Sequence, residues 1–172
     1  MLFTFHYDSP IGGLTLESDG LALTGLRFNM ANLSVDSRGS SDTVSIQSTR
    51  VLPAIEQSER WLDKYFDGKD PGAVPPVCLR STPFRRVVWE TLLTIPYGET
   101  MSYGQVAGIV ARQLGVARMS AQAVGSAVGH NPIAVIIPCH RVIAADGSLG
   151  GFSAGVERKA WLLRHEGVKI SK

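Results

Sequence analysis

The C-terminal half of the chain takes its fold from residues 102–132, which read SYGQVAGIVARQLGVARMSAQAVGSAVGHNP. Ser102 precedes Gln105 by three positions, which is the spacing of a capping box. In a capping box the serine side chain and the residue three positions later each satisfy a backbone N–H at the start of a helix. The pattern therefore predicts a helix over residues 103–112.

A second helix is predicted over about residues 121–128. Ser120 can cap its start, and the sequence Gly129-His130-Asn131-Pro132 ends it. Two short helices with a compact connection are typical of a helix-turn-helix. The second helix is built from unusually small residues, so its face could either approach a groove wall or pack tightly in the interior.

The N-terminal half carries a different pattern. Apolar and polar residues alternate in three segments separated by turn sequences, which predicts an antiparallel meander over residues 3–7, 14–16 and 23–28. Residues 29–48 lack periodic apolar positions and read as a long loop, whereas residues 51–66 show helical spacing that Gly68 ends.

The proline-rich stretch 67–83 reads as a linker between two domains. We therefore expect an α/β chain with a small antiparallel-sheet domain over residues 1–79. A mainly helical domain with the helix-turn-helix follows over residues 80–172. Residues 84–93 and about 156–163 are also predicted to be helical.

Composition favours an ordinary folded protein. The 172 residues are 44% hydrophobic and 19% charged, and no apolar run approaches the length that crosses a bilayer. The N-terminus lacks the basic region and cleavage site of a secretory signal, so a cytoplasmic location is expected. Cys78 and Cys139 are too few for a disulfide framework and are expected to be free thiols.

The net charge of +2 is unevenly distributed. Residues 1–79 contain 6 Lys and Arg against 10 Asp and Glu, for −4, whereas residues 80–172 contain 11 against 5, for +6. A polyanion is therefore expected to bind the C-terminal half, although an imbalance of this size also arises by chance.

The candidate nucleophile is Cys139. Residues 134–137 form a short β-prone run that leads into Pro138 and Cys139, with His140 and Arg141 beside the thiol. A neighbouring base or positive charge favours the thiolate, which is the nucleophilic form. Adjacent side chains of an extended strand face opposite ways, so a bridging water is expected between Cys139 and His140.

Two further features remain open from the residues alone. The glycine-rich segment 147–155 could line a pocket for a planar group, cradle phosphates or form a plain turn, but it lacks the ending of a P-loop. Glu166, after the last predicted helix, could orient a histidine or only decorate a helix end.

Together these residues resemble the O6-alkylguanine-DNA alkyltransferase family. The resemblance rests on Ile137-Pro138-Cys139-His140-Arg141-Val142, preceded by Asn131-Pro132. This core is followed by the glycine-rich segment, Arg158-Lys159, Trp161-Leu162-Leu163 and His165-Glu166-Gly167. It continues back through Tyr97-Gly98-Glu99 and Ser102-Tyr103 to about Thr82. The N-terminal half fits the small RNase H-like domain of the family only loosely.

The resemblance implies single-turnover repair of double-stranded DNA. Cys139 would accept the alkyl group from O6 of a guanine that has flipped out of the duplex, because that atom lies inside the base pair. Glu166 would hold His140, which through water would take the thiol proton. Tyr103 would crowd the adjacent phosphate and donate its hydroxyl to guanine, and Asn131 would brace the turn before the cysteine.

The remaining implied roles concern binding. Contacts to guanine are expected from Val142, Gly150, Phe152 and Ser153. The predicted helix over residues 121–128 would enter the minor groove. Contacts to DNA are expected from Ser102, Tyr103, Ala121, Gln122, Ala123, Gly125, Ser126 and Arg141. No metal or organic cofactor is needed, no membrane is involved, and a monomer is expected.

The chain departs from the family pattern at three places. Gln122 stands where the family usually has an arginine that fills the gap left by the flipped base. Residues 109–119 look longer than the corresponding stretch of compact members, and Phe152 replaces the usual tyrosine.

Three other interpretations fit the sequence less well than alkyl transfer. A non-catalytic binder of DNA lesions would lack the cysteine that this chain has. A cysteine hydrolase using Cys139 and His140 lacks an identifiable orienting group and oxyanion hole. A zinc site fails on the spacing of the two cysteines and four histidines.

Overall fold

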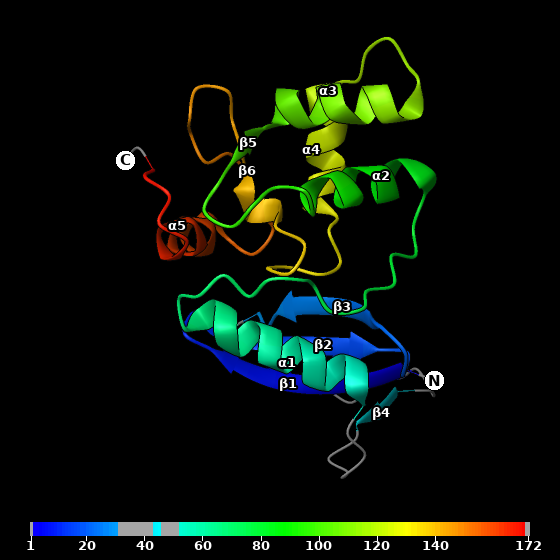
Figure 1. Cartoon of the computed structure of the whole chain (residues 1–172), viewed down its shortest axis with the longest axis vertical. Coiled ribbons are helices and arrows are strands. Elements are labelled where there is room, and N and C mark those ends of the chain that lie inside the picture. Colours follow the sequence, from blue (N-terminus) through cyan, green and yellow to red (C-terminus); the bar gives the residue numbers. More distant parts are fainter. Residues whose placement is uncertain (1, 31–42, 46–51, 171–172) are drawn as a thin grey trace. The chain divides into compact units, whose positions relative to one another are not determined.

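The computed structural model describes residues 2–30, 43–45 and 52–170. It divides into two compact units, Met1–Leu79 with Pro132–Ile136 and Arg80–Asn131 with Ile137–Lys172. The predicted α/β class is confirmed, because a small sheet with one helix occurs in the first unit and helices dominate the second (Figure 1).

The first unit is built on a four-stranded sheet. Its strands are β1 (Leu2–Ser9), β2 (Gly12–Ser18), β3 (Leu23–Phe28) and β4 (Thr43–Ser45). The order is β3-β2-β1-β4, and the predicted antiparallel meander of β1, β2 and β3 is present. Gly12 has a φ of 118°, which allows the tight turn between the first two strands.

The strand β4 corrects the sequence-based interpretation of residues 29–48 as a loop. It pairs with β1 in parallel, with Leu2 opposite Thr43. The three meander strands are long enough to show alternating apolar and polar residues, but a three-residue strand is too short to show this pattern. The other residues of that stretch from 31 to 48 lie outside the described residues.

The helix α1 (Pro53–Phe66) covers one face of the sheet (Figure 1). Proline at its first position has a backbone already set for a helix. Ile55, Leu62 and Tyr65 are buried on one side, and Tyr7 of β1 donates a hydrogen bond to Asp63 at 2.8 Å. The buried side of α1 thus packs in the apolar core of the first unit with buried leucines of the strands, Leu14, Leu16 and Leu26.

The stretch predicted as a linker is partly held against this sheet. The amide of Leu23 donates to the carbonyl of Pro76, and the amide of Cys78 donates to the carbonyl of Leu23, both at 2.8 Å. Cys78 is a free thiol of intermediate exposure.

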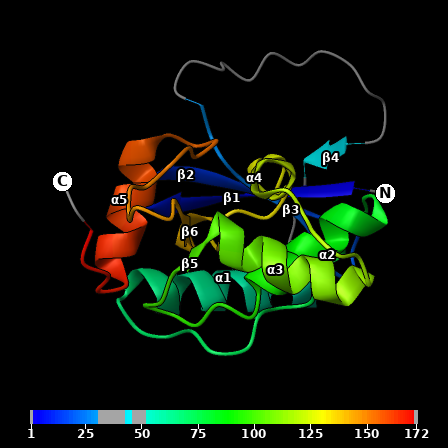
Figure 2. The same ribbon diagram turned by 90° about the horizontal axis from the view of Figure 1, so that it is seen from above.

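The second unit packs its helices around an apolar core. They are α2 (Pro83–Leu92), α3 (Tyr103–Leu114), α4 (Ala121–Gly129) and α5 (Val156–His165). Ser102 and Gln105 form the predicted capping box of α3, and Ser120 caps α4 by accepting from the amides of Gln122 and Ala123. The axis of α4 crosses that of α3, so α4 is seen end-on in Figure 2.

The predicted strand over residues 134–137 is wrong. This segment is a turn in which Val135 has a φ of 66°, and only Ile133 makes an isolated bridge, to Leu26. Short apolar runs do not distinguish strands from buried turns. The cysteine that follows therefore lies on a short 3-10 helix, η1 (Cys139–Arg141), and not at the end of a strand.

The chain after η1 enters β6 (Val142–Ile143), which pairs in parallel with β5 (Met101–Ser102). Because Ser102 also caps α3, this short ladder ties the start of α3 to the residues that follow the cysteine.

Candidate active site

Cys139 lies at the first position of η1 and is only 5% exposed. Burial raises the pKa of its thiol above the ordinary value, while hydrogen bonding by Asn131 and by backbone amides and the charge of Lys159 act in the opposite direction. The thiol is therefore protonated at rest but has groups around it that stabilise the thiolate.

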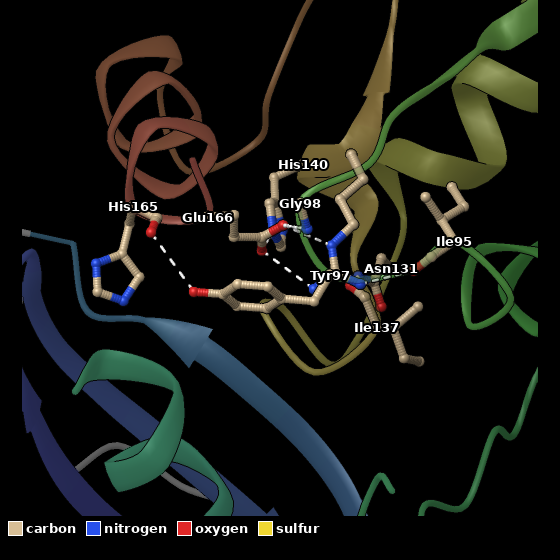
Figure 3. Close-up of polar contacts among 9 residues, drawn as sticks. Ile95, Tyr97, Gly98, Asn131, Ile137, His140, His165 and Glu166 are labelled. Atoms are coloured by element: carbon tan, nitrogen blue, oxygen red, sulfur yellow. Dashed lines mark hydrogen bonds and ion pairs between the residues drawn. The ribbon is translucent and has the colours of Figure 1, made fainter. Parts of the chain in front are cut away.

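Glu166, the C-cap of α5, connects the elements around the cysteine (Figure 3). Its Oε1 lies 2.6 Å from Nε2 of His140, and its Oε2 accepts from Nε of Arg141 at 2.8 Å. The amide of Gly98 also donates to Oε2, at 3.2 Å. The carboxylate thus fixes η1, α5 and the turn after Tyr97 in one arrangement.

The charges of this network follow from its contacts. Burial alone would raise the pKa of Glu166, but His140 and Arg141 lower it to about 2, so Glu166 is an anion at neutral pH. Burial lowers the pKa of His140, although the neighbouring carboxylate acts to raise it. The lowered pKa keeps the imidazole neutral. Since a carboxylate only accepts, Nε2 of His140 carries the proton and Nδ1 is its basic nitrogen.

Asn131 closes the turn that precedes the cysteine. Its Nδ2 donates to the carbonyl of Ile137 at 2.8 Å, so one side chain joins the two ends of residues 132–136 (Figure 3). The same side chain also hydrogen-bonds Cys139 and lowers the pKa of its thiol.

The thiol opens into a cavity of about 370 Å³. Residues of α3, α4, η1 and the glycine-rich loop surround it: Tyr103, Gly125, Val128, Gly129, Cys139, Gly151, Phe152 and Ser153. Most of the lining residues are apolar, and the polar groups come from the serine, the tyrosine and the cysteine. Such a cavity suits a flat, mostly apolar ring with a few polar edges.

Tyr103 and the glycine-rich loop shape one side of the cavity. A Cβ at Gly150 would lie 3.3 Å from the ring and from the hydroxyl oxygen of Tyr103, and Gly150 has a φ of 67°. Gly125 of α4 faces the same ring. Small residues at these positions therefore allow the tyrosine to lie close to both the loop and α4.

The helix α4 has two faces. Val124, Ala127 and Val128 are buried, and the indole of Trp89 donates to the carbonyl of Ala127 at 2.8 Å. Ala121, Gln122 and Ser126 are exposed, whereas Ala123 and Gly125 are partly buried. The two interpretations left open from the sequence, packing and a free surface, thus apply to opposite sides of one helix.

Comparisons with known proteins agree with this geometry. The family model described as "6-O-methylguanine DNA methyltransferase, DNA binding domain" matches residues 83–168. The methylated-DNA--protein-cysteine methyltransferase of Mycobacterium tuberculosis is 44% identical over 167 residues, which cover 94% of this chain and 92% of the relative. The enzyme of the same name from Mycobacterium leprae is 43% identical over 171 residues, with 96% and 93% covered.

The chain belongs to this methyltransferase family. Among solved structures, Mycobacterium tuberculosis OGT in complex with DNA is 41% identical, with a TM-score of 0.73 and coverage of 96% of this chain and 91% of that one. An O6-methylguanine-DNA methyltransferase from Pyrococcus kodakaraensis shares the fold at 20% identity and a TM-score of 0.53.

Within the family framework, the structure gives Arg141 a different place from the one expected. Arg141 is buried, and its guanidinium donates to both oxygens of Glu166 and to the carbonyl of Ile95 at 2.7 Å. A DNA contact was expected for it, but a guanidinium satisfied inside the unit does not reach a phosphate. Arg141 instead positions Glu166.

Ser102, also expected at the DNA, uses its hydroxyl oxygen to accept from the amide of Gln105 at 3.1 Å. The residues expected to bind guanine do not all line the cavity. Phe152 and Ser153 line the cavity, whereas Val142 is buried in β6.

The sequence places Lys159 in the stretch that resembles the family but assigns it no role. This residue is fully buried on α5, and its position relative to Leu162, Leu163 and Glu166 is the spacing of one helix face. That spacing was the available signal.

Among the described residues, no three His, Cys, Asp or Glu side chains gather in a way that could hold a metal ion. In the same part of the chain, no helix is long and apolar enough to span a membrane.

Proposed function

We propose that this member of the family repairs DNA by transferring an alkyl group from O6 of guanine to Sγ of Cys139. The observation that carries the proposal is a buried thiol at the wall of a cavity of about 370 Å³, next to a histidine held by a carboxylate. A target inside the base pair must leave the stack before it can enter such a cavity.

The substrate of the proposed reaction is double-stranded DNA that contains an O6-alkylguanine. The exposed face of α4 with Gln122 and Ser126 is the surface that enters the minor groove. Gly125 lies both on this helix and in the cavity lining, so the groove-binding surface continues into the pocket. Tyr103, at the start of α3, stands at the same opening.

The chemical step is a displacement at the alkyl carbon. Nδ1 of His140 takes the thiol proton through a water, and the thiolate forms the S–C bond while the C–O6 bond breaks. The electron pair of that bond goes to O6 of guanine, and the hydroxyl of Tyr103 donates a hydrogen bond that stabilises the anionic base. Glu166 stabilises the imidazolium formed on His140.

The product is a thioether on Cys139. This bond is chemically stable, and nothing in the sequence suggests a way to cleave it. One molecule therefore repairs one lesion.

Intact-mass measurement tests the proposal. After incubation with duplex DNA containing O6-methylguanine, the wild-type protein should gain one methyl group, located on the Cys139 peptide. Cys139→Ser should bind the same DNA and gain nothing, because a hydroxyl is far less acidic than a thiol. Cys78→Ser, the matched control, should transfer as the wild type does.

Unmodified wild-type protein that still binds the damaged DNA would favour a non-catalytic lesion binder. A methyl group found on Cys78 would overturn the assignment of the acceptor.

A further inference from the structure

Lys159 is a buried cation that the proposed reaction does not use. Its side chain is 0% exposed, although lysine is among the residues least often buried completely. Nζ donates to the carbonyl of Val142 at 2.6 Å and lies within hydrogen-bonding distance of the carbonyl of Gly151 at 3.3 Å. It also lies 5.8 Å from the centroid of the Tyr103 ring.

These three partners belong to different segments of the second unit. Val142 is in β6, directly after the cysteine helix η1, whereas Gly151 is in the glycine-rich loop and lines the cavity. Tyr103 begins α3 and lines the cavity as well. One ammonium group on α5 therefore contacts three separate segments around the same cavity.

We propose that Lys159 is a positioning residue that fixes the width of the guanine pocket, because its ammonium bridges the carbonyls of Val142 and Gly151. The inference rests on the proposed alkyl transfer and adds a residue that shapes its binding site.

The loop needs such a restraint from outside. Gly150 and Gly155 both have positive φ values, and a segment rich in glycine gains little order from its own backbone. Arg158, the neighbour of Lys159 on α5, donates to the carbonyl of Ala154 at 3.0 Å and holds the far side of the same loop. Two successive residues of one helix thus bind two carbonyls of the loop.

Burial would be costly for a lysine without such a role. An apolar side chain of similar length would fill the same space without the desolvation penalty of an ammonium group. Burial lowers the pKa of Lys159 to about 8, while the neighbouring Cys139 acts to raise it. With a pKa of about 8 the ammonium group stays mostly charged at neutral pH, and the carbonyl partners give the charge a direction.

A competing explanation is that Lys159 only adds positive charge near the thiol. Its charge does act to lower the pKa of Cys139. The two explanations differ in what they change. A lost charge reduces the fraction of thiolate, whereas a lost bridge weakens binding of the base.

The test uses the full chain with Lys159→Met, and Arg164→Met as the control because Arg164 is an exposed cation on the same helix. Transfer from free O6-benzylguanine is measured over base concentration, and carboxamidomethylation of Cys139 by iodoacetamide is measured over pH. We expect Lys159→Met to raise the half-saturating base concentration about tenfold, because it removes hydrogen bonds from a charged donor. At pH values where the thiol is fully ionised, Lys159→Met should react with iodoacetamide at the wild-type rate. Arg164→Met should change neither the half-saturating base concentration nor the iodoacetamide rate.

The bridge would be contradicted by a Lys159→Met protein with an unchanged half-saturating base concentration. In that case its transfer would be slowed only by the factor by which its reaction with iodoacetamide is slowed at the same pH. Absence of transfer by the wild-type protein would instead contradict the proposed function.

A measurement on the unaltered protein covers the case in which Lys159→Met does not fold. Nitrogen-15 NMR at pH 6 should detect a slowly exchanging ammonium signal from Lys159, since buried and hydrogen-bonded protons exchange slowly. Rapid exchange of this ammonium would contradict the bridge.

Discussion

At the scale of single residues, Gly150 shows how closely the pocket is fitted. Its φ of 67° disfavours any side chain, and an added Cβ would lie 3.3 Å from the Tyr103 ring. We predict that Gly150→Ala displaces Tyr103 and slows transfer at least about tenfold, as expected when a group at the reacting centre is misplaced. Single-turnover rates on duplex DNA with O6-methylguanine would measure this.

Gly147 provides a matched control for this prediction. It has a φ of 83° in the same loop, but nothing lies within 4 Å of its missing Cβ. Gly147→Ala should therefore share the backbone strain of about 1–3 kcal/mol without touching the tyrosine. Equal losses of transfer in both variants would show that strain in the loop, and not Tyr103, limits the reaction.

The lowered pKa of Glu166 predicts that the stability of the fold depends on pH. Its pKa of about 2 in the folded protein lies below the ordinary value of 4.5, so its contribution is complete above about pH 4.5 and is lost as the pH falls toward 2. Because a tenfold change in acidity is equivalent to about 1.4 kcal/mol, this lowered pKa contributes on the order of 3 kcal/mol. Because the pKa of His140 is lowered in the folded protein, only the unfolded chain takes up its proton just below pH 6.5, and this also destabilises the fold as the pH falls.

Urea unfolding at pH 7, 4.5 and 3 would test this for the wild type and Glu166→Gln. The variant should be less stable at pH 7, since buried Arg141 loses its anion, and its stability should decline less between pH 4.5 and 3. Parallel declines in the two proteins would mean that the pKa of Glu166 is not lowered in the folded state.

At the scale of elements, α4 carries the main departure from the family pattern. Gln122 is exposed in its first turn, where the family usually has arginine. A guanidinium can stack and hydrogen-bond in the gap left by a flipped base, whereas a neutral amide brings no charge. We predict that Gln122→Arg accelerates transfer from duplex DNA and that Gln122→Ala slows it.

Neither variant should change transfer from a free O6-alkylguanine base, because only the duplex reaction includes unstacking, which costs a few kcal/mol. Single-turnover rates on both substrates would separate the steps. Equal effects on duplex and free base would place Gln122 in the pocket or in the stability of α4, not in the DNA stack.

The helices of the second unit were predictable because their signals are local. The capping box of Ser102 and Gln105 and the N-cap Ser120 place the starts of α3 and α4 correctly, since each satisfies backbone amides within its own first turn. The spacing of apolar residues similarly predicted α1 and α5. The predicted bounds of these helices differ from the observed ones by one or two residues.

The errors concern tertiary contacts. Residues 134–137 are apolar in a strand as in a buried turn, and only the pairing of Ile133 with Leu26 and the backbone of Val135 decide between them. Arg141 was expected at the DNA because the sequence does not reveal that Glu166 and Ile95 meet it in the interior. The spacing of Lys159 on α5 indicates that it is buried but not which carbonyls it binds, because those partners come from other segments.

At the scale of the whole molecule, charge is divided between the two units. Pro132–Ile136 carries no charged residue, so the sums of −4 and +6 found for the two halves also hold for the two units. No Asp or Glu occurs between Glu99 and Asp146, a stretch that includes α3 and α4. A polyanion approaching this part of the chain meets no acidic side chain from it.

This distribution leads to a prediction about salt. Arg112, in the last turn of α3, and Arg118, two residues before the cap of α4, are both exposed and lie at either end of the connection between these helices. Phosphates neutralised by such residues release counterions, so affinity for DNA should fall linearly on a plot of log K against log salt. Arg112→Ala and Arg118→Ala should each weaken binding to any sequence and reduce the slope by about 1.

The control is Arg60→Ala on α1. Arg60 is also exposed but pairs with Glu56 in the acidic unit, so the slope of this variant should equal that of the wild type. A slope unchanged in all three variants would show that neither α3 nor the α3–α4 connection contacts the phosphate backbone, and binding would then have to depend on α4 and the pocket alone.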